Sequence, residues 1–284
     1  MVLLKKTGEN AYINMNSYKK KWLGAIFFTR LHLDLIGKVF YFKKYERRYT
    51  MSDSTTALTK KEKVALEARR FIARVYAWMT VALVVSAASA FFAAGSEAAI
   101  KLIWGGKHIG FYVLVALEIL LVIVISASLP KIPVGFAGFL FVLYSIVNGL
   151  TLSAIFLVFK IESIGVVFLI SAGMFFAMSL YGRFTKQDLN SAGRYLMMAL
   201  FGLIILAIVN LFLKSGPLQW IISLVTLVVF IGLTAYDTNK IVRASQLADG
   251  SDVFKKAAIY GALELYLDFL NIFLSLLNLF GKKR

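Results

Sequence analysis

The sequence predicts an all-α polytopic membrane protein, a bundle of seven transmembrane helices whose last helix is central and carries a polar stripe. Hydrophobic residues make up 60% of the 284 residues and charged residues only 17%, whereas soluble domains carry about 25% charged residues. The mean hydropathy is +0.76, and the apolar residues are concentrated in runs of roughly twenty, each long enough to cross a bilayer core of about 30 Å. A soluble enzyme, a fibrous chain and a disordered chain are therefore excluded.

Residues 1–58 form a basic leader that precedes the spans. The first 70 residues hold 16 Lys and Arg against 6 Asp and Glu. The aromatic stretch from Trp22 to Phe42 is interrupted by ionisable side chains, and a charge near a helix centre costs about 2.5–3.5 kcal/mol, so we expect no span there. Because Met51-Ser-Asp-Ser looks like an ordinary translation start, we hypothesise that residues 1–50 are an upstream extension of the gene model. A peptide from those residues in the native protein, found by mass spectrometry, would contradict this hypothesis.

The membrane domain is expected to cover residues 59–284. Thr59-Lys-Lys-Glu62 has the capping-box pattern, which predicts that a helix begins there. Proline residues at 130, 133 and 217 mark two of the short connectors between packed neighbours. We place the seven spans at 71–94, 109–129, 134–159, 162–181, 192–213, 218–238 and 257–279.

The distribution of Lys and Arg predicts a cytoplasmic N-terminus in a multi-pass inner-membrane protein, because the side with more basic loops stays inside. One set of loops holds eight basic residues, not counting the leader: Lys131, Arg183, Lys186, Arg194, Lys240, Arg243, Lys255 and Lys256. The opposite set holds four: Lys101, Lys107, Lys160 and Lys214. Seven spans then place the basic tail Lys282-Lys283-Arg284 outside. Either the last segment is re-entrant, or the earlier spans fix the orientation and the tail is tolerated.

Four ionisable side chains lie inside the predicted spans, where such groups are costly and are candidates for function. They are Glu118, Asp237, Glu264 and Asp268. In the last span the polar residues recur at spacings of four and three, which keeps them on one helical face. This stripe consists of Glu264, Asp268, Asn271, Ser275 and Asn278. A polar stripe on a membrane helix faces protein or water, so we expect this helix at the centre of the bundle.

Asp237 and Asp268 are candidates for a pH-sensitive pair. If the sixth and seventh helices are neighbours, the two carboxylates can meet, and two close carboxylates in a poorly solvated site share one proton. Such a pair changes its charge on modest acidification, which is a physical basis for a gate. The alternative is that Asp237 is hydrated, or is paired with Lys240 or Arg243. Asn148 and Asn210 are interpreted as interhelical hydrogen-bonding residues.

Three segments resemble the signatures of the Bax inhibitor-1 family, in its bacterial YccA-like branch. Residues 235–241 (AYDTNKI) and 262–273 (ALELYLDFLNIF) are similar to the family's sixth-helix and seventh-helix motifs, and residues 184–193 (FTKQDLNSAG) to its loop before the fifth helix. The resemblance covers about residues 69–281 and leaves the leader outside.

The resemblance implies a seven-helix bundle that acts as a pH-sensitive calcium leak. In that family the aspartates of the sixth and seventh helices form the proton sensor, and they correspond here to Asp237 and Asp268. Calcium is then the permeant ion, held weakly and transiently by this pair, with no other cofactor, and Glu264, Asn271 and Glu118 are supporting polar residues. Some members latch the closed state with an arginine on the second helix. This sequence has no arginine there and carries Glu118 instead, so closure must differ or depend on another basic group.

Catalytic readings fit the sequence poorly, so we expect no enzyme. An intramembrane aspartyl protease would match Tyr236-Asp237, but Leu265-Tyr-Leu-Asp268 has no glycine directly before the aspartate, and no proline motif follows it. A retinal pump would need a buried lysine in the last span. The absence of cysteine and the presence of only two histidines, His32 and His108, exclude thiolate chemistry and multi-histidine metal or haem sites.

The remaining alternative is a non-conducting regulator that binds a membrane-anchored protease or another stress-response protein. The relatives that the chain resembles include regulators of membrane proteolysis, and the basic leader would offer a docking segment. The bilayer is the expected surrounding, and nucleic acid is not an expected partner, because the basic residues flank spans and form no recognised nucleic-acid-binding fold.

Overall fold

The fold is a bundle of long helices, seen in a computed structural model that describes residues 2–3, 12–13, 57–105, 109–128 and 131–284. Two short strands in the leader pair antiparallel. The rest of residues 1–50, to which the hypothesis of an upstream extension applies, lies outside the described residues. The elements are β1 (Val2–Leu3), β2 (Tyr12–Ile13), α2 (Ala57–Gly95), α3 (Glu97–Trp104), α4 (Ile109–Ser128), α5 (Val134–Leu152), α6 (Ala154–Val158), α7 (Ile161–Phe184), α8 (Asn190–Leu213), α9 (Gly216–Ser245) and α10 (Asp252–Phe280).

Within the described part of the chain, seven helical segments are long and apolar enough to cross a membrane, which confirms the predicted fold class. They are α2, α4, α5 with α6, α7, α8, α9 and α10. Large apolar side chains cover the outside of the bundle, among them Leu169, Phe212 and Val228, with exposed fractions of 71%, 81% and 62%. In a membrane this surface contacts lipid tails.

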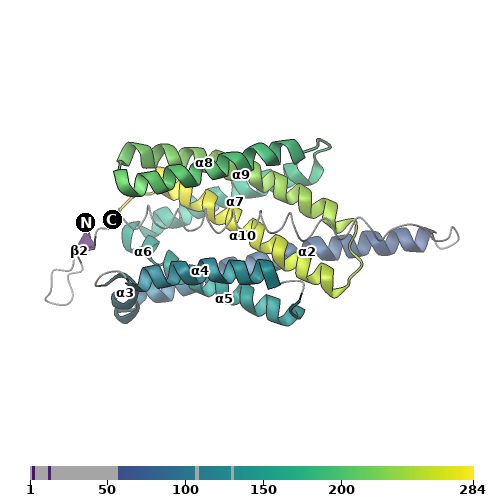
Figure 1. The fold of residues 1–284 in the computed structure, drawn as a ribbon, viewed down its shortest axis with the longest axis horizontal. Helices are drawn as coiled ribbons and strands as arrows, with labels where there is room; N and C mark the ends of the chain where they lie inside the picture. The colour runs from purple at the N-terminus through teal and green to yellow at the C-terminus, as the bar shows by residue number, and fades with distance from the viewer. Residues whose placement is uncertain (1, 4–11, 14–56, 106–108, 129–130) are drawn as a thin grey trace.

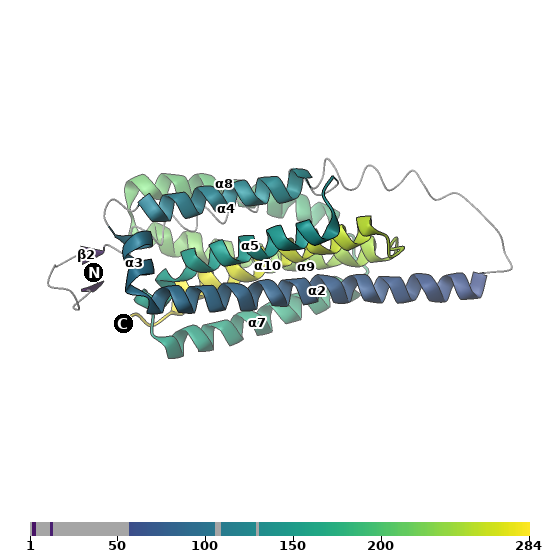
Figure 2. The same cartoon turned by 90° about the horizontal axis from the view of Figure 1, so that it is seen from below.

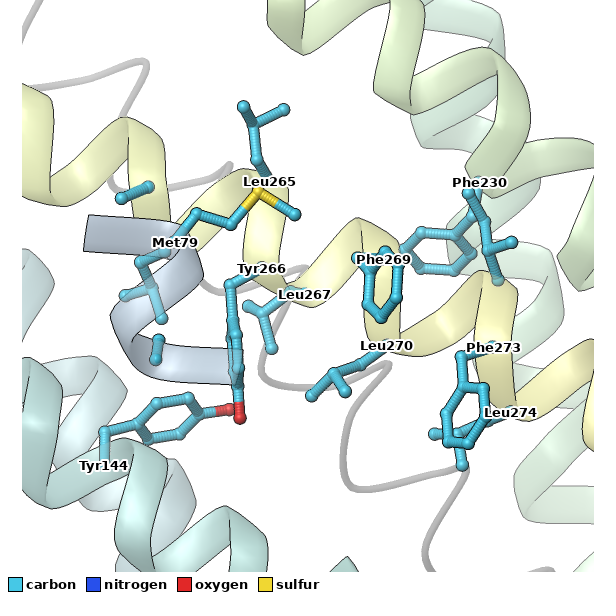
Figure 3. Packing of buried hydrophobic residues seen from close by; sticks show 14 of the residues in the cluster. Met79, Tyr144, Phe230, Leu265, Tyr266, Leu267, Phe269, Leu270, Phe273 and Leu274 are labelled. Carbon is cyan, nitrogen blue, oxygen red and sulfur yellow. The ribbon is translucent and has the colours of Figure 1, made fainter. Parts of the chain in front are cut away.

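α10 lies at the centre of the bundle, as the sequence predicts. It crosses between a group formed by α7, α8 and α9 and a group formed by α2, α4 and α5 (Figure 1). It packs against α9, α2, α7 and α5, and every residue from Ala258 to Leu277 is buried. Its aromatic and aliphatic side chains, including Tyr266, Phe269 and Phe273, fill the space between neighbouring helices (Figure 3).

Three features of the helices differ from the predicted spans. α2 begins at Ala57, and its first turns project past the other helices (Figure 2), because a charged, good helix-forming segment continues the helix beyond its apolar part. The short α3 begins at Glu97, directly after Ser96, whose side chain caps the helix by accepting from the backbone N–H of Ala99. The third span is broken at Ser153, which separates α5 from α6.

The bundle has two ends that carry different connectors. We call one the loop end, where the α4–α5, α7–α8 and α9–α10 connectors lie, and the other the tail end, where the chain terminates (Figure 1). α10 is one continuous helix of 29 residues between them, so the last segment is not re-entrant. At the tail end the backbone after α10 pairs with the α6–α7 connector, through Lys160 N to Lys282 O and Arg284 N to Val158 O, both 3.0 Å.

Candidate functional site in the buried polar residues of α9 and α10

The polar stripe of α10 is enclosed by protein. Glu264, Asp268, Asn271 and Ser275 are each 1% exposed or less, whereas Asn278, nearer the tail end, is half-buried. The Nδ2 of Asn271 donates to the carbonyl oxygen of Leu267 one turn earlier, at 2.8 Å. Buried polar and ionisable groups of this kind face neighbouring helices, because lipid offers them no partner.

The matching face of α9 is also buried. Thr226, Thr234 and Asp237 are fully enclosed. The hydroxyl of Thr234 donates to the carbonyl oxygen of Phe230 in its own helix, at 2.8 Å. α9 and α10 are antiparallel neighbours that pack along one another, so these groups lie against the central helix.

An ion pair fixes the register between the two helices. Lys240 Nζ lies 2.6 Å from Glu264 Oε1, and a Cβ atom on Gly261 would lie 3.2 Å from Ile241 Cγ1. In an antiparallel pair, moving three residues back along α9 corresponds to moving about three residues forward along α10, since the rise per residue is the same. The ion pair thus places Asp237 opposite Leu267, and the approach of Gly261 to Ile241 places it opposite Leu265, within about one turn of Asp268. We call Asp237, Glu264 and Asp268 the acidic seam.

Two neighbouring helices approach the backbone beside Asp237 closely. A Cβ atom on Gly182 of α7 would lie 2.2 Å from the carbonyl oxygen of Ala235, and one on Gly193 of α8 would lie 2.4 Å from the ring of Tyr236. Asn239 Nδ2 donates to the carbonyl oxygen of Gly182 at 3.0 Å. These contacts hold the segment around Asp237 between α7 and α8, which gives the 184–193 segment a structural link to the sixth-helix motif.

An exposed ion pair fastens the α7–α8 connector to α9. Arg243 Nη2 lies 3.0 Å from Asp188 Oδ1. Asp188 also accepts from the backbone N–H of Asn190 at 3.1 Å. That backbone hydrogen bond, together with the Arg243 guanidinium, lowers the pKa of the Asp188 carboxyl below its usual value. The two basic residues that the sequence offers as partners for Asp237 thus engage other carboxylates, Lys240 that of Glu264 and Arg243 that of Asp188.

Glu118 belongs to a second buried polar cluster, between α2, α4, α5 and α10. Its side chain is fully enclosed, Thr151 Oγ1 donates to its Oε1 at 2.6 Å, and the side chain of Asn148 lies beside the same carboxylate. Oε2 has no protein hydrogen-bond partner among the described residues. The contact with Thr151 joins α4 to α5.

Tyr266 connects this second cluster to the central helix. Its hydroxyl donates to Asn148 Oδ1 at 2.9 Å and lies 2.7 Å from Ser86 Oγ on α2. The hydroxyl of Tyr144 points toward it from α5 (Figure 3). Tyr266 is two residues from both Glu264 and Asp268 and so projects from a different side of α10. α10 therefore carries the acidic seam on one side and the Tyr266 contacts on another.

Several of these residues were not predicted as site residues. Thr151, Ser86 and Tyr266 were not singled out, and Lys240 was considered only as a partner for Asp237. A usable signal was present on α5, where Asn148 and Thr151 lie three residues apart on one face of an apolar helix. Asn210 bonds to Gln219 and accepts from Ser215 N, each at 3.0 Å, so it organises the α8–α9 turn.

The described residues contain no group of three or more His, Cys, Asp or Glu side chains placed to hold a metal ion. Calcium takes six to eight oxygen ligands when it is bound tightly.

The fold and the buried site together define the class of the protein. It is a multi-pass membrane protein whose central helix carries ionisable side chains that the other helices shield from lipid. Residues 68–284 match the family model described as "Inhibitor of apoptosis-promoting Bax1", and the chain belongs to this Bax inhibitor-1 family. The resemblance of the three motifs is thereby confirmed. The family is not a known enzyme family.

Bacterial relatives match most of the chain. The inner membrane protein YbhL of Escherichia coli K12 is 45% identical over 216 residues, which are 75% of this chain and 92% of YbhL. An uncharacterized protein of Borreliella burgdorferi is 39% identical over 228 residues, 80% of this chain and 98% of that protein. The Rickettsia prowazekii protein RP147 is 36% identical over 237 residues, 83% of this chain and 98% of its own length.

Proposed function

We propose that the chain is a pH-sensitive calcium leak channel of the cytoplasmic membrane, gated by Asp237 and Asp268. One observation carries the proposal: two fully buried aspartates lie on neighbouring helices of a membrane bundle, Asp237 on α9 and Asp268 on the central α10. Ionisable groups enclosed in this way mark ion pathways and proton relays in membrane proteins. The membership of the family and the resemblance of the motifs support the same function.

The proposed gate works through the charge of the pair. Two carboxylates that approach one another in a poorly solvated site share a proton, which holds α9 and α10 together. Loss of that proton places like charges on facing helices and favours their separation. A calcium ion then finds two carboxylates and few further oxygens, such as the Asn271 amide and the Thr234 hydroxyl, and weak binding suits conduction because the ion must also leave.

The proposed orientation has the N-terminus and the loop end in the cytoplasm. The connectors at the loop end and the helix ends beside them carry eight Lys and Arg, against four at the opposite connectors and helix ends, and the side with more basic residues remains inside. Because α10 runs through the bundle, the basic tail then faces the outside and is tolerated. The inner-membrane assignment of YbhL supports this location.

The test is calcium influx into liposomes that contain the purified protein and a calcium dye. Influx is measured between about pH 5.5 and pH 8, the range over which a coupled carboxylate pair is expected to change charge, for the parent, Asp237→Asn and Asp268→Asn. We expect influx by the parent to depend on pH and either substitution to flatten that dependence. Asp249→Asn is the matched control: it makes the same chemical change in the α9–α10 loop, at an exposed residue that accepts from Ser251 N.

Two outcomes overturn the proposal. If the parent liposomes admit no more calcium than empty liposomes at every pH, conduction is wrong. If the parent conducts but Asp249→Asn alters the pH profile as much as the two seam variants do, the pair is not the sensor.

The second candidate function is a non-conducting regulator that binds a membrane-anchored protease or another stress-response protein. The observation that favours it is the projecting start of α2 (Figure 2), where basic and apolar side chains such as Lys63 and Leu66 are exposed. Deletion of residues 1–66, which removes the leader together with Lys63 and Leu66, is expected to abolish partner regulation and leave calcium influx intact if both functions coexist. If regulation survives the deletion, the leader is not the docking segment.

A further inference from the structure

The Lys240 ammonium occupies an unusual position between solvent and the acidic seam. Lys240 lies five residues before the end of α9, about 8 Å from the loop end at the rise of an α-helix. Its side chain is 19% exposed, whereas its partner Glu264 is 1% exposed. The alkyl chain therefore leads from the loop end, and the charged group is directed inward to the buried carboxylate.

Two contacts hold the ammonium in this place. Besides its ion pair with Glu264 at 2.6 Å, Lys240 Nζ lies 5.8 Å from the centre of the buried Tyr260 ring. An ammonium over an aromatic face is attracted by the ring, more strongly where water is excluded. Tyr260 and Glu264 are one turn apart on α10, so both act on the same cation from one face.

The acidic seam behind this cation carries more negative than positive groups. Glu264 is one turn nearer the loop end than Asp268, and Lys240 is one turn nearer than Asp237. Among the carboxylates of the seam on α10, Glu264 is therefore the one nearer the loop end. That carboxylate is the group that Lys240 neutralises.

We propose that the Lys240 ammonium is an internal cation that closes the loop end of the acidic seam and is displaced when a divalent cation binds there. The inference rests on the proposed function, because it describes how access to the same seam is regulated. Lys240 is not a ligand for the ion. It competes with the ion for the same carboxylate. Its side chain is long enough to place an ammonium at Glu264, where a free cation would otherwise bind.

Two substitutions at Lys240 separate the charge of the side chain from its hydrogen-bonding capacity, since glutamine still offers Glu264 a neutral donor. Lys240→Gln removes the ammonium, and we expect calcium influx to rise by about tenfold, which corresponds to about 1.4 kcal/mol of barrier. Lys240→Arg keeps the cation and is expected to stay within about twofold of the parent. Lys255→Gln is the matched control, because it breaks an exposed ion pair with Asp252 at the same end of the bundle.

Because the chain contains no cysteine, the ammonium can also be restored chemically. In Lys240→Cys, aminoethyl methanethiosulfonate adds a side chain of roughly lysine length that ends in an ammonium, and methyl methanethiosulfonate adds only a neutral methyl disulfide. We expect the charged reagent to return the raised influx to the parental value and the neutral reagent to leave it raised. Equal effects of both reagents would mean that side-chain volume, not charge, closes the seam, and would overturn the inference.

A measurement that needs no flux separates this inference from the proposed function. The rate at which an amine-acetylating reagent modifies Lys240 and Lys255 is followed by mass spectrometry while calcium is added. We expect the Lys240 rate to rise and saturate with calcium and the Lys255 rate to stay constant. If the liposomes do not conduct but this rise is seen, the channel function fails and the displacement stands. A Lys240 rate that is independent of calcium overturns the displacement, whether or not the protein conducts.

Discussion

A buried carboxylate is stabilised by the hydrogen-bond donors around it. At Glu118 one of these donors is the neutral hydroxyl of Thr151. Thr151 Oγ1 lies 2.6 Å from Glu118 Oε1 in a fully enclosed position. Hydrogen bonds of this type in a water-free interior are costly to leave unmade, because the group that loses its partner stays desolvated. The strength of the contact between α4 and α5 therefore depends strongly on one hydroxyl group.

Thr151→Val keeps the shape of the side chain and removes that hydroxyl. We expect the free energy of unfolding to fall by about 1–3 kcal/mol, measured by reversible denaturation in detergent. Thr80→Val is the control, since the Thr80 hydroxyl is exposed and bonds only to its own helix, at the carbonyl oxygen of Tyr76. Equal losses in the two variants would show that the contact with Glu118 adds nothing.

The pKa of Asp188 depends on two donors that can be separated. Because the backbone N–H of Asn190 is the larger cause and Arg243 the second, Arg243→Gln is expected to raise the lowered pKa only part of the way to its usual value. The measurement is a carbon-13 NMR titration of the labelled aspartate carboxyl groups. Arg183→Gln removes a guanidinium at the same connector whose charge does not act on Asp188, and it should leave the titration unchanged.

The sign of the stability effect at Asp188 follows from the lowered pKa. The ion pair contributes to stability above the unfolded-state pKa of about 3.9, and this contribution is lost as the pH falls through the lower pKa of the folded state. The α7–α8 connector is thus held at neutral pH and released only in acid below that range. A change of fold stability near neutral pH cannot come from this pair.

Among individual residues, the sequence identified the buried carboxylates more readily than the side chains that bond to them. Asp237, Glu264 and Asp268 stand out because a charge in an apolar run is rare. Lys240 and Thr151 do not, because a lysine near a helix end and a threonine within a span are both ordinary there. Their roles depend on which helices are neighbours and at what register, which composition and periodicity do not specify.

Among the elements, α2 and α5 approach one another so closely that one position admits only glycine. A Cβ atom on Gly149 would lie 2.5 Å from the carbonyl oxygen of Ser86 and 2.7 Å from Ser89 Cβ. Contact with backbone cannot be relieved by a change of rotamer. Close approach through small residues is a common means by which membrane helices associate, since lipid gives no hydrophobic drive.

Gly149→Ala is therefore expected to separate α2 from α5 and to lower the free energy of unfolding by about 1–3 kcal/mol. Gly173→Ala is the control, because nothing lies within 4 Å of a Cβ atom at that position on α7. That variant should be neutral or slightly stabilising, since alanine favours a helix over glycine. Both variants are compared by the same detergent denaturation, and a loss of stability at Gly173 as large as that at Gly149 would contradict the packing argument.

The elements themselves were largely predictable, because twenty-residue apolar runs leave few alternatives in a membrane. Their ends and interruptions were not. α9 continues to Ser245 past its apolar part, and the break at Ser153 follows no proline or glycine. Such features are decided by tertiary contacts, as with the Trp104 indole N–H that donates to Ser153 Oγ at 3.2 Å.

For the whole molecule, the proposed orientation predicts that the two ends of the bundle are accessible from opposite sides of the membrane. Single cysteines are introduced into the cysteine-free chain at two exposed positions, Asp249→Cys at the loop end and Lys283→Cys at the tail end. If the loop end is cytoplasmic, a membrane-impermeant maleimide added to intact spheroplasts labels the second and not the first. Permeabilised spheroplasts serve as the control, because both cysteines should then react. The reverse pattern would contradict the proposed orientation.

The sequence predicts the class of the whole molecule well and its internal geometry only in part. The position of α10 at the centre follows from its stripe, because a helix with polar groups on one side and apolar groups elsewhere has no stable place at the lipid boundary. The order in which α2, α5, α7 and α9 surround it does not follow. That order is a property of packing between segments far apart in the chain.

The backbone pairing after α10 gives the central helix a fixed pivot. Since Lys282 and Arg284 are bonded to the connector that starts α7, α10 cannot slide along its own axis without breaking those bonds or carrying α7 with it. Its remaining freedom is to swing like a lever about the tail end. Over a lever of about 43 Å, a tilt of roughly 10° moves the opposite tip by about 7 Å. A small rotation at the tether would thus move the start of α10 widely and shift Glu264, the partner of Lys240, by about 4 Å.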